Sequence, residues 1–190
     1  MSANYIIDQV FENQNFDQRA LIYKDFERCK FSNCDFTSAD FSGTAFIDCT
    51  FVDCNFERAP INYVALRDVI FIGCNFVAVN FAMVDTLLFG VSFTKCKLDY
   101  AKFYTLKLKG TTFSDCSIVA ADFMKSDLSE ATFDNCDLHQ SVFQQAIANK
   151  ADFSTSYNFS IDPESTKLKR AVFSKDGLSG LLKKYDLLVR

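Results

Sequence analysis

The sequence predicts an all-β solenoid, on the basis of two regular spacings. Large apolar residues, mostly phenylalanine, recur at every fifth position along most of the chain, and 20 of the 22 phenylalanines obey this rule. The cysteines add a period of twenty residues, with one step of 22 between Cys74 and Cys96. A period of five fits neither an α-helix nor an ordinary strand. It fits a coil with four sides of five residues each, in which residues twenty apart stack directly above one another.

Each predicted side points two residues inward, a large one and a small one two positions before it. The small positions hold mainly cysteine, alanine, valine and threonine, as a narrow cross-section requires. The large residues are then expected to stack in four columns that begin at Phe31, Phe36, Phe41 and Phe46, and the fourth column includes Leu88. Each buried phenylalanine contributes roughly 1.5–3 kcal/mol to stability. The long-range contacts run between neighbouring coils, as in other solenoids.

The predicted repeat spans residues 11–153, between an N-terminal cap at 1–10 and a C-terminal cap at 154–190. Two extra residues near 82–87 explain the step of 22, either as a kink that the coil absorbs or as a recognition feature. In the C-terminal cap, Ser174 is expected to be a helix N-cap. A short strand is predicted at 187–189. The helix after Ser174 presents an apolar stripe at helical spacing, formed by Leu178, Leu181, Leu182 and Tyr185.

Cysteine usage leaves two possibilities open. Stacked coils place equivalent Cα atoms about 4.8 Å apart, a separation that a disulfide can bridge. Parallel, inward-pointing side chains and a cytoplasmic location instead favour free thiols. We predict a cytoplasmic protein, because residues 1–10 lack the basic start and apolar stretch of a signal peptide and no segment approaches a membrane span.

No catalytic residue, metal site or cofactor is predicted. The sequence has no glycine-rich phosphate loop and no set of nucleophile, histidine and acid, and His139 is the only histidine. There is no CxxC pair for a metal. Aspartate and asparagine recur before the central residue of each side because their side chains can bond the backbone of the corner.

Several runs resemble the A(D/N)Lxx repeat of the pentapeptide repeat family, over about four fifths of the chain; they include CDFTSADFSGTAF, CTFVDCNF, CSIVAADF and SDLSEATFDNCDL. The resemblance implies a right-handed quadrilateral parallel β-helix, in agreement with the general hand of parallel crossovers. The tail SYNFSIDPESTKLKRAVFSKDGLSGLLKKYDLLV resembles the ending of Qnr- and McbG-like members. Those members bind type II topoisomerases and protect them from quinolones or microcin.

The resemblance also implies a homodimer in which two solenoids, or towers, meet at their C-terminal ends through the C-terminal helix. The candidate dimer interface consists of Leu178, Leu181, Leu182, Tyr185 and Leu187. The alternative is that the same helix caps the open end of a single solenoid, where unpaired backbone and apolar side chains need cover.

Charge bears on the choice of partner. Residues 11–153 hold 19 acidic and 13 basic side chains, net −6, and the tail from Ser154 has net +3. The resembling proteins imitate B-DNA and occupy the DNA-binding saddle of gyrase. Imitation here requires acidic residues on one face with the lysines elsewhere, and an ordinary solvated surface is the alternative. The candidate acidic face is Asp35, Asp40, Asp48, Asp53, Glu57, Asp68 and Asp85.

Two functions follow. The first is a non-catalytic DNA mimic that binds DNA gyrase or topoisomerase IV, without direct contact to nucleic acid or membrane, and counters quinolones or a gyrase-directed toxin. The second is a general protein-interaction rod with a partner other than a topoisomerase. Alignment of the acidic residues on one face distinguishes the two.

Overall fold

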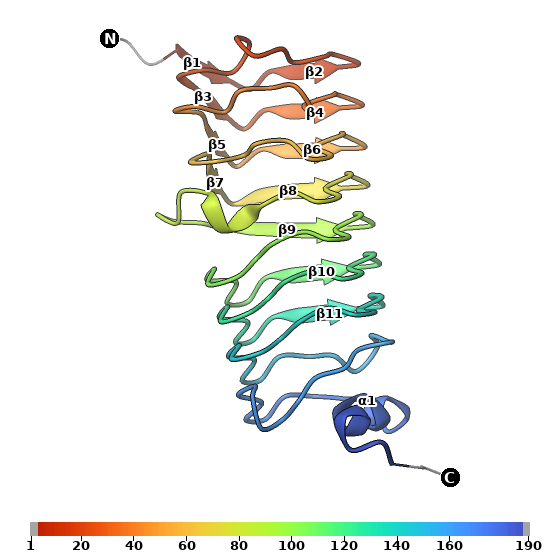
Figure 1. Cartoon of the computed structure of the whole chain (residues 1–190). Coiled ribbons are helices and arrows are strands. Elements are labelled where there is room, and N and C mark those ends of the chain that lie inside the picture. The colour runs from red at the N-terminus through yellow and green to blue at the C-terminus, as the bar shows by residue number, and fades with distance from the viewer. Residues whose placement is uncertain (1–3, 188–190) are drawn as a thin grey trace.

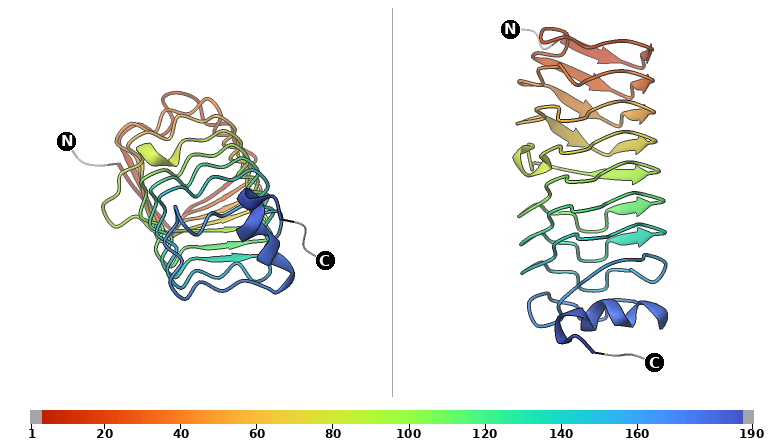
Figure 2. Two further views of the ribbon diagram at one scale, coloured as in Figure 1. Left: turned by 60° about the horizontal axis from the view of Figure 1, so that its bottom comes forward. Right: turned by 45° about the vertical axis from the view of Figure 1, so that its right-hand side comes forward.

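The structure, a computed structural model, describes residues 4–187 and forms a tall parallel β-solenoid (Figure 1, Figure 2). One face is a seven-stranded parallel sheet that contains β2 (Val10–Glu12), β4 (Lys30–Ser32), β6 (Thr50–Val52), β8 (Val69–Ile72), β9 (Val91–Thr94), β10 (Thr112–Ser114) and β11 (Thr132–Asp134). Another is a four-stranded parallel sheet of β1 (Asn4–Ile7), β3 (Lys24–Glu27), β5 (Ala45–Ile47) and β7 (Ala65–Arg67). The prediction of an all-β solenoid is confirmed.

We number the four sides in chain order. Side 1 is the seven-stranded sheet, in which Phe31 pairs with Phe51, and side 4 is the four-stranded sheet with its continuation toward the C-terminus. Sides 2 and 3 are ladders of isolated parallel bridges, such as Asn15 to Asp35 on side 2 and Lys102 to Asp122 on side 3. Side 2 and side 4 therefore lie opposite one another across the core.

The predicted columns of phenylalanine fill the core. On side 1 the rings stack one above the next, for example Phe31 on Phe51 at 4.6 Å and Phe71 on Phe93 at 5.4 Å between centroids. Rings from adjacent sides meet edge to face, as Phe71 and Phe76 do at 4.9 Å. The edge-to-face contact between adjacent sides is a geometry that aromatic quadrupoles favour.

The corners explain the recurrence of aspartate and asparagine before each central residue. Asp35 accepts a hydrogen bond from the backbone N–H two residues later at 2.9 Å, and Asp122 and Asp152 accept the equivalent bonds in later coils. The residue at the next corner position has a positive φ, as at Asp53 and Glu130. The sequence-based expectation for these residues is confirmed.

All eight cysteines are buried free thiols, as expected. Their Sγ atoms point inward and bond backbone carbonyl oxygens, as Cys49 Sγ does with the oxygen of Phe26 at 3.4 Å. Burial raises the pKa of the Cys49 thiol to about 12. The thiolate, which is the reactive form, is therefore scarce at neutral pH.

Thiol reagents are expected to modify the native protein at least about 100-fold more slowly than a free cysteine, because all eight thiols are buried. All eight cysteines should react after denaturation. Labelling with a chromogenic disulfide reagent, followed by mass spectrometry, checks this. Rapid modification of Cys74 or Cys96 in the native state would show that these two cysteines, which flank the step of 22 residues, do not face the core.

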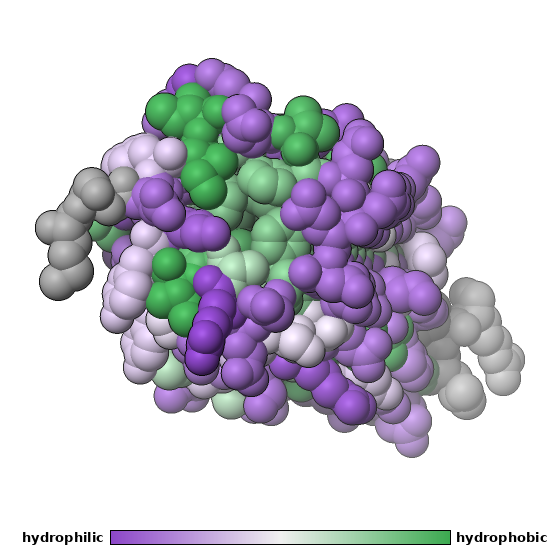
Figure 3. Space-filling model, turned by 90° about the horizontal axis from the view of Figure 1, so that it is seen from above, coloured by the Kyte–Doolittle hydropathy of each residue, from purple (hydrophilic) through white to green (hydrophobic). Residues whose placement is uncertain are grey.

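The structure places the boundaries of the repeat differently from the prediction. Residues 4–10 are not a cap, because β1 pairs in register with β3 and forms part of the first coil. Seen from this end, apolar side chains show in the centre of the tower (Figure 3), and Tyr5 and Val10 are exposed. At the other end the coils continue past 153, because Asp152 bridges Val172 and Phe153 stacks on Phe173 at 5.2 Å.

The two extra residues lie later than the predicted 82–87. The 20-residue register still holds where Ala65 bridges Asp85, and it becomes 22 where Val69 pairs with Val91. A bulge over residues 87–90 therefore absorbs the insertion, after the short 3-10 helix η1 (Phe81–Met83). Placing Leu88 in the fourth column is wrong, because it is 74% exposed and Phe89 packs against the core instead.

The C-terminal segment turns across the end of the tower as one short helical stretch. It comprises η2 (Asp176–Leu178), α1 (Ser179–Leu182) and η3 (Lys183–Tyr185). Ser174 caps it as predicted, because its hydroxyl oxygen accepts a hydrogen bond from the N–H of Gly177 at 3.0 Å. Leu187 has no strand conformation, and the other residues of the predicted strand at 187–189 lie outside the described residues.

Candidate partner-binding surfaces

The seven residues of the candidate acidic face are distributed around the tower. Asp35, Asp53 and Glu57 belong to side 2 or to the corner that leads into it. Asp40 lies on side 3, where hydrogen bonds from the hydroxyl and N–H of Ser42 lower the pKa of its carboxyl. The remaining three, Asp48, Asp68 and Asp85, lie on side 4 and its following corner. The register thus divides the set between three sides.

Side 2 nevertheless carries an acidic surface that runs along the tower, which we call the side 2 acidic surface. With both of its corners it holds seven carboxylates against three basic groups, net −4. The carboxylates are Asp17, Asp35, Asp53, Glu57, Asp99, Asp115 and Asp137, and the basic residues are Arg58, Lys95 and Lys97. Four of the seven carboxylates are absent from the set predicted from the sequence, which groups acidic residues by their position along the chain. Sorting residues by their position within the 20-residue period would have found them.

Short side-chain bonds hold the side 2 acidic surface in place. Asp99 accepts hydrogen bonds from the hydroxyl of Ser117 at 2.6 Å and from the N–H of Val119 at 3.0 Å, both in the next coil. Asp115 accepts from the side-chain amide of Asn135 at 2.7 Å. Asp99 and Asp115 are thus held in place by groups of the next coil, which suits recognition by a basic partner surface.

The lysines of the C-terminal half of the tower lie mainly on other sides. Lys102 is on side 3, where it bridges Asp122, and Lys107 is on side 4, where it bridges Asp127. Of the lysines in this half, only Lys95 and Lys97 belong to the side 2 acidic surface, and both lie in a single coil. The arrangement that imitation of DNA requires is therefore partly present.

The candidate dimer interface lies on the C-terminal helical stretch. Leu178, Leu182 and Tyr185 are exposed there, and Leu187 is exposed just beyond its end. Leu181 differs, because it is partly buried and packs against the core. The helix therefore covers the end of its own solenoid with one face and presents apolar side chains to solvent on the other.

The helix is held to the last coil by close contacts and ion pairs. The N–H of Ile161 donates to the carbonyl oxygen of Gly180 at 3.1 Å. Lys184 Nζ lies 2.7 Å from Asp162 Oδ1 and also bonds Glu164, which in turn accepts from the Tyr185 hydroxyl at 2.7 Å. Bonding to Lys184 lowers the pKa of both carboxyls and raises the pKa of the Lys184 ammonium.

The described residues offer no metal site and no membrane-spanning helix. Between residues 4 and 187, no three His, Cys, Asp or Glu side chains are arranged to hold a metal ion. In the same part of the chain, no helix is long and apolar enough to cross a bilayer.

Solved structures provide one comparison. QnrB1, described as a plasmid-mediated fluoroquinolone resistance protein, is similar in a trypsin-treated form over 98% of this chain and 100% of its own, at 22% identity and a TM-score of 0.46. HetL, a pentapeptide repeat protein involved in heterocyst differentiation regulation in the cyanobacterium Nostoc sp. strain PCC 7120, is similar over 89% of this chain and 85% of its own, at 15% identity and a TM-score of 0.49.

Sequence comparison gives the family. No curated protein matches the sequence significantly. The model of the pentapeptide repeat region matches residues 24–87, 53–123 and 86–161, which together extend over most of the solenoid. These matches cover the coils whose five-residue period builds the core, and the chain belongs to the pentapeptide repeat family.

Proposed function

We propose that this protein is a non-catalytic, cytoplasmic DNA mimic that binds DNA gyrase or topoisomerase IV and thereby protects the enzyme from quinolones or a gyrase-directed toxin. The side 2 acidic surface is the observation that carries the proposal. Its carboxylates extend from Asp17 to Asp137, six coils apart and so about 29 Å along the tower. The resemblance of the tail to Qnr- and McbG-like members supports the choice of partner.

The charge density sets how strong this imitation can be. Duplex DNA of about 29 Å carries roughly 17 negative charges, at one per about 1.7 Å of axis. The side 2 acidic surface has net −4 on one face of the tower. A partner that binds from one side meets only part of the phosphates, which narrows this difference in charge. With fewer charges than DNA, the protein would still bind more weakly, and salt would weaken the binding further.

The proposal includes a dimer joined through the C-terminal helical stretch. Leu178 and Leu182 are 48% and 36% exposed, and contact between two copies would remove them from water. Substitution of both by glutamate is the appropriate disruption, because Leu181 packs against its own solenoid and its loss would disturb the cap.

A supercoiling assay with purified gyrase tests the function. The variant Asp35→Asn, Asp53→Asn, Asp115→Asn, Asp137→Asn removes four charges from side 2. The same columns already hold asparagine in other coils, at Asn33, Asn55 and Asn135 for example, so the fold should be preserved. Wild-type protein is expected to compete with DNA for gyrase at low salt, and the variant to do so at least about tenfold less well.

The control variant Asp48→Asn, Asp68→Asn removes acidic residues of side 4 and should compete like wild type. Equal loss of competition in the two variants would contradict the assignment to side 2. If neither gyrase nor topoisomerase IV binds the wild-type protein or changes activity at low salt and micromolar concentration, the DNA-mimic proposal fails. The general interaction rod is then the better description.

A further inference from the structure

Side 4 carries opposite charges in its two halves. The bulge at residues 87–90 divides it, and we count its outward-facing columns with both corners. The N-terminal half has net −4, from Asp8, Asp25, Glu27, Asp48, Asp68 and Asp85 against Arg28 and Arg67. The C-terminal half has net +5, from Lys107, Lys109, Lys125, Lys150, Lys167, Lys169 and Arg170 against Asp127 and Glu130.

Many of these charges have no ion-pair partner within the described residues. Arg28 pairs with Asp8 and Lys150 with Glu130, at 2.8 and 3.0 Å, so each half neutralises part of its own charge. No salt bridge within residues 4–187 involves the following charged side chains of side 4: Asp25, Asp48, Asp68, Lys107, Lys167, Lys169 and Arg170.

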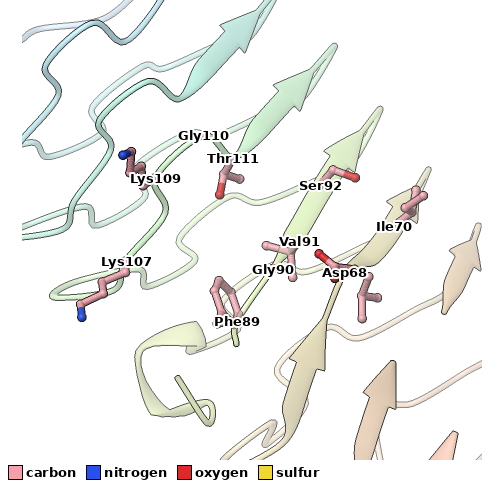
Figure 4. A pocket seen from close by; sticks show the side chains of 11 residues that line it. Asp68, Ile70, Phe89, Gly90, Val91, Ser92, Lys107, Lys109, Gly110 and Thr111 are labelled. Atoms are coloured by element: carbon pink, nitrogen blue, oxygen red, sulfur yellow. The ribbon is translucent and has the colours of Figure 1, made fainter. Parts of the chain in front are cut away.

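The boundary between the two halves has a distinctive shape. Leu87 and Leu88 project from the bulge and are 64% and 74% exposed. Beside them lies a hollow of about 460 Å³, lined among others by Asp68, Phe89 and Lys109 (Figure 4).

The hollow exists because two successive corner positions, Gly90 and Gly110, have no side chain. A Cβ on Gly90 would lie 2.9 Å from Asp68 Oδ1 and 3.2 Å from the Asp68 backbone nitrogen, so a side chain here would require the Asp68 carboxylate to move. A Cβ on Gly110 would meet nothing within 4 Å. The corner tolerates side chains in the next coils, at Glu130 and Lys150, although both have positive φ. The open space at Gly110 is therefore not imposed by the backbone.

We propose that side 4 is a lateral self-association surface, on which a second copy of this chain packs antiparallel. A two-fold axis that lies in the interface and crosses side 4 just beyond the bulge brings each acidic half against the other copy's basic half. It also places each projecting Leu87–Leu88 pair opposite the hollow of the other copy. A parallel arrangement would oppose like charges and is disfavoured.

The register allows the opposed residues to be named. Counting coils outward from the axis places four matched pairs across the interface: Asp25 with Lys167, Glu27 with Lys169, Asp48 with Lys150, and Asp85 with Lys107. The two-fold symmetry makes each of these pairs twice, as in any isologous interface. Two like-charge oppositions remain, Asp68 with Glu130 and Arg28 with Arg170. They are weakened because Glu130 and Arg28 already pair within their own chain.

The size and chemistry of this surface indicate a weak, reversible contact. Nine coils at about 4.8 Å give a strip roughly 40 Å long, and a width near 12 Å gives about 1,000 Å² buried in total, at the lower end for specific interfaces. Its charges are exposed, so salt should weaken it. Side 2 lies on the opposite face and stays accessible, and the surface is separate from the C-terminal helix.

Sedimentation velocity tests the proposal on the full chain. The background variant Leu178→Glu, Leu182→Glu removes the contact proposed at the C-terminal helix. In this background the protein should be dimeric at about 0.05 M salt and monomeric at about 0.5 M, a change of at least tenfold in the dissociation constant. A matched control, Lys95→Glu with Lys97→Glu on side 2, should leave the dimer unchanged.

Two charge reversals in the same background make the test specific. The variant Lys150→Glu, Lys167→Glu, Lys169→Glu makes side 4 acidic throughout, and Asp25→Lys, Glu27→Lys, Asp48→Lys makes it basic. Each should be monomeric alone at low salt, and an equimolar mixture should form heterodimers. Monomers at low salt in the background variant up to about 100 µM, dimers in either reversed variant alone, or a mixture that stays monomeric would overturn the proposal.

Discussion

Replacing Phe71 by alanine is expected to lower the free energy of unfolding by about 3–5 kcal/mol. The ring is 2% exposed and stacks between Phe51 and Phe93, at 5.1 and 5.4 Å. The strands β6, β8 and β9 hold the three rings in register, so neighbouring coils cannot close the resulting cavity. Chemical denaturation measures the loss, and the solenoid should still unfold cooperatively because each coil depends on its neighbours.

Two further variants place this value in context. Phe71→Leu should cost less than about 1.5 kcal/mol, because leucine fills most of the volume and already occupies core columns at Leu98 and Leu108. Phe11→Ala should also cost less than Phe71→Ala, since Phe11 lies in the first coil and is only partly buried. A loss below about 1 kcal/mol for Phe71→Ala would contradict the assignment of Phe71 to a packed column.

The fold was predictable from the sequence because the repeat is local. Every five-residue unit turns one large and one small side chain inward. The columns then follow, because residues twenty apart stack on one another. Phe31, Phe51 and Phe71 stack as the count requires, and the cysteines lie beside them. The ends were harder, because the first coil includes residues before the first phenylalanine of the pattern and pairs through β1.

The five-residue period does not predict the conformation of the insertion. The 20-residue period does predict the side on which each acidic residue lies. Leu87, Leu88 and Phe89 are all large and apolar, so the period alone could not tell which of them turns inward. Backbone pairing determines which residue turns inward, because it keeps the 20-residue register as far as Asp85. The 20-residue period assigns each acidic residue to one side, whereas position along the chain groups residues from different sides.

The seal over the C-terminal end depends on packing that no period could reveal. Phe159 lies outside both phenylalanine registers, yet it is 2% exposed, because the last coil turns it into the core beneath the helical stretch. Gly177 and Gly180 lie on its ring and allow the helix backbone to come close. An apolar residue out of register therefore marks the point where the cap begins.

Gly180→Val is expected to lift the helical stretch off the end of the tower. A Cβ at this position would lie 2.6 Å from the Phe159 ring and 2.7 Å from the Phe159 carbonyl oxygen. The ring is enclosed and the carbonyl belongs to the backbone, so neither can give way easily, and overpacking of this kind costs about 1–3 kcal/mol. The hydrogen bond from Ile161 to Gly180 and the anchors at Lys184 and Tyr185 should open together.

Hydrogen exchange locates this effect. Amides of the helical stretch and of Ile161 should lose protection by at least about tenfold. Amides of β6 and β8 should keep theirs, because the bonds that hold the cap run to Ile161, Asp162 and Glu164 in the last coil. Gly110→Ala is the matched control: its Cβ has open space, and only the positive φ of 71° opposes it, at a cost of about 1–2 kcal/mol without any change at the cap. Unchanged protection of Ile161 in Gly180→Val would show that the helix does not depend on the close approach to Phe159. If the cap does open, the exposed leucines lose their fixed arrangement, and the contact proposed between two C-terminal helices should be lost with it.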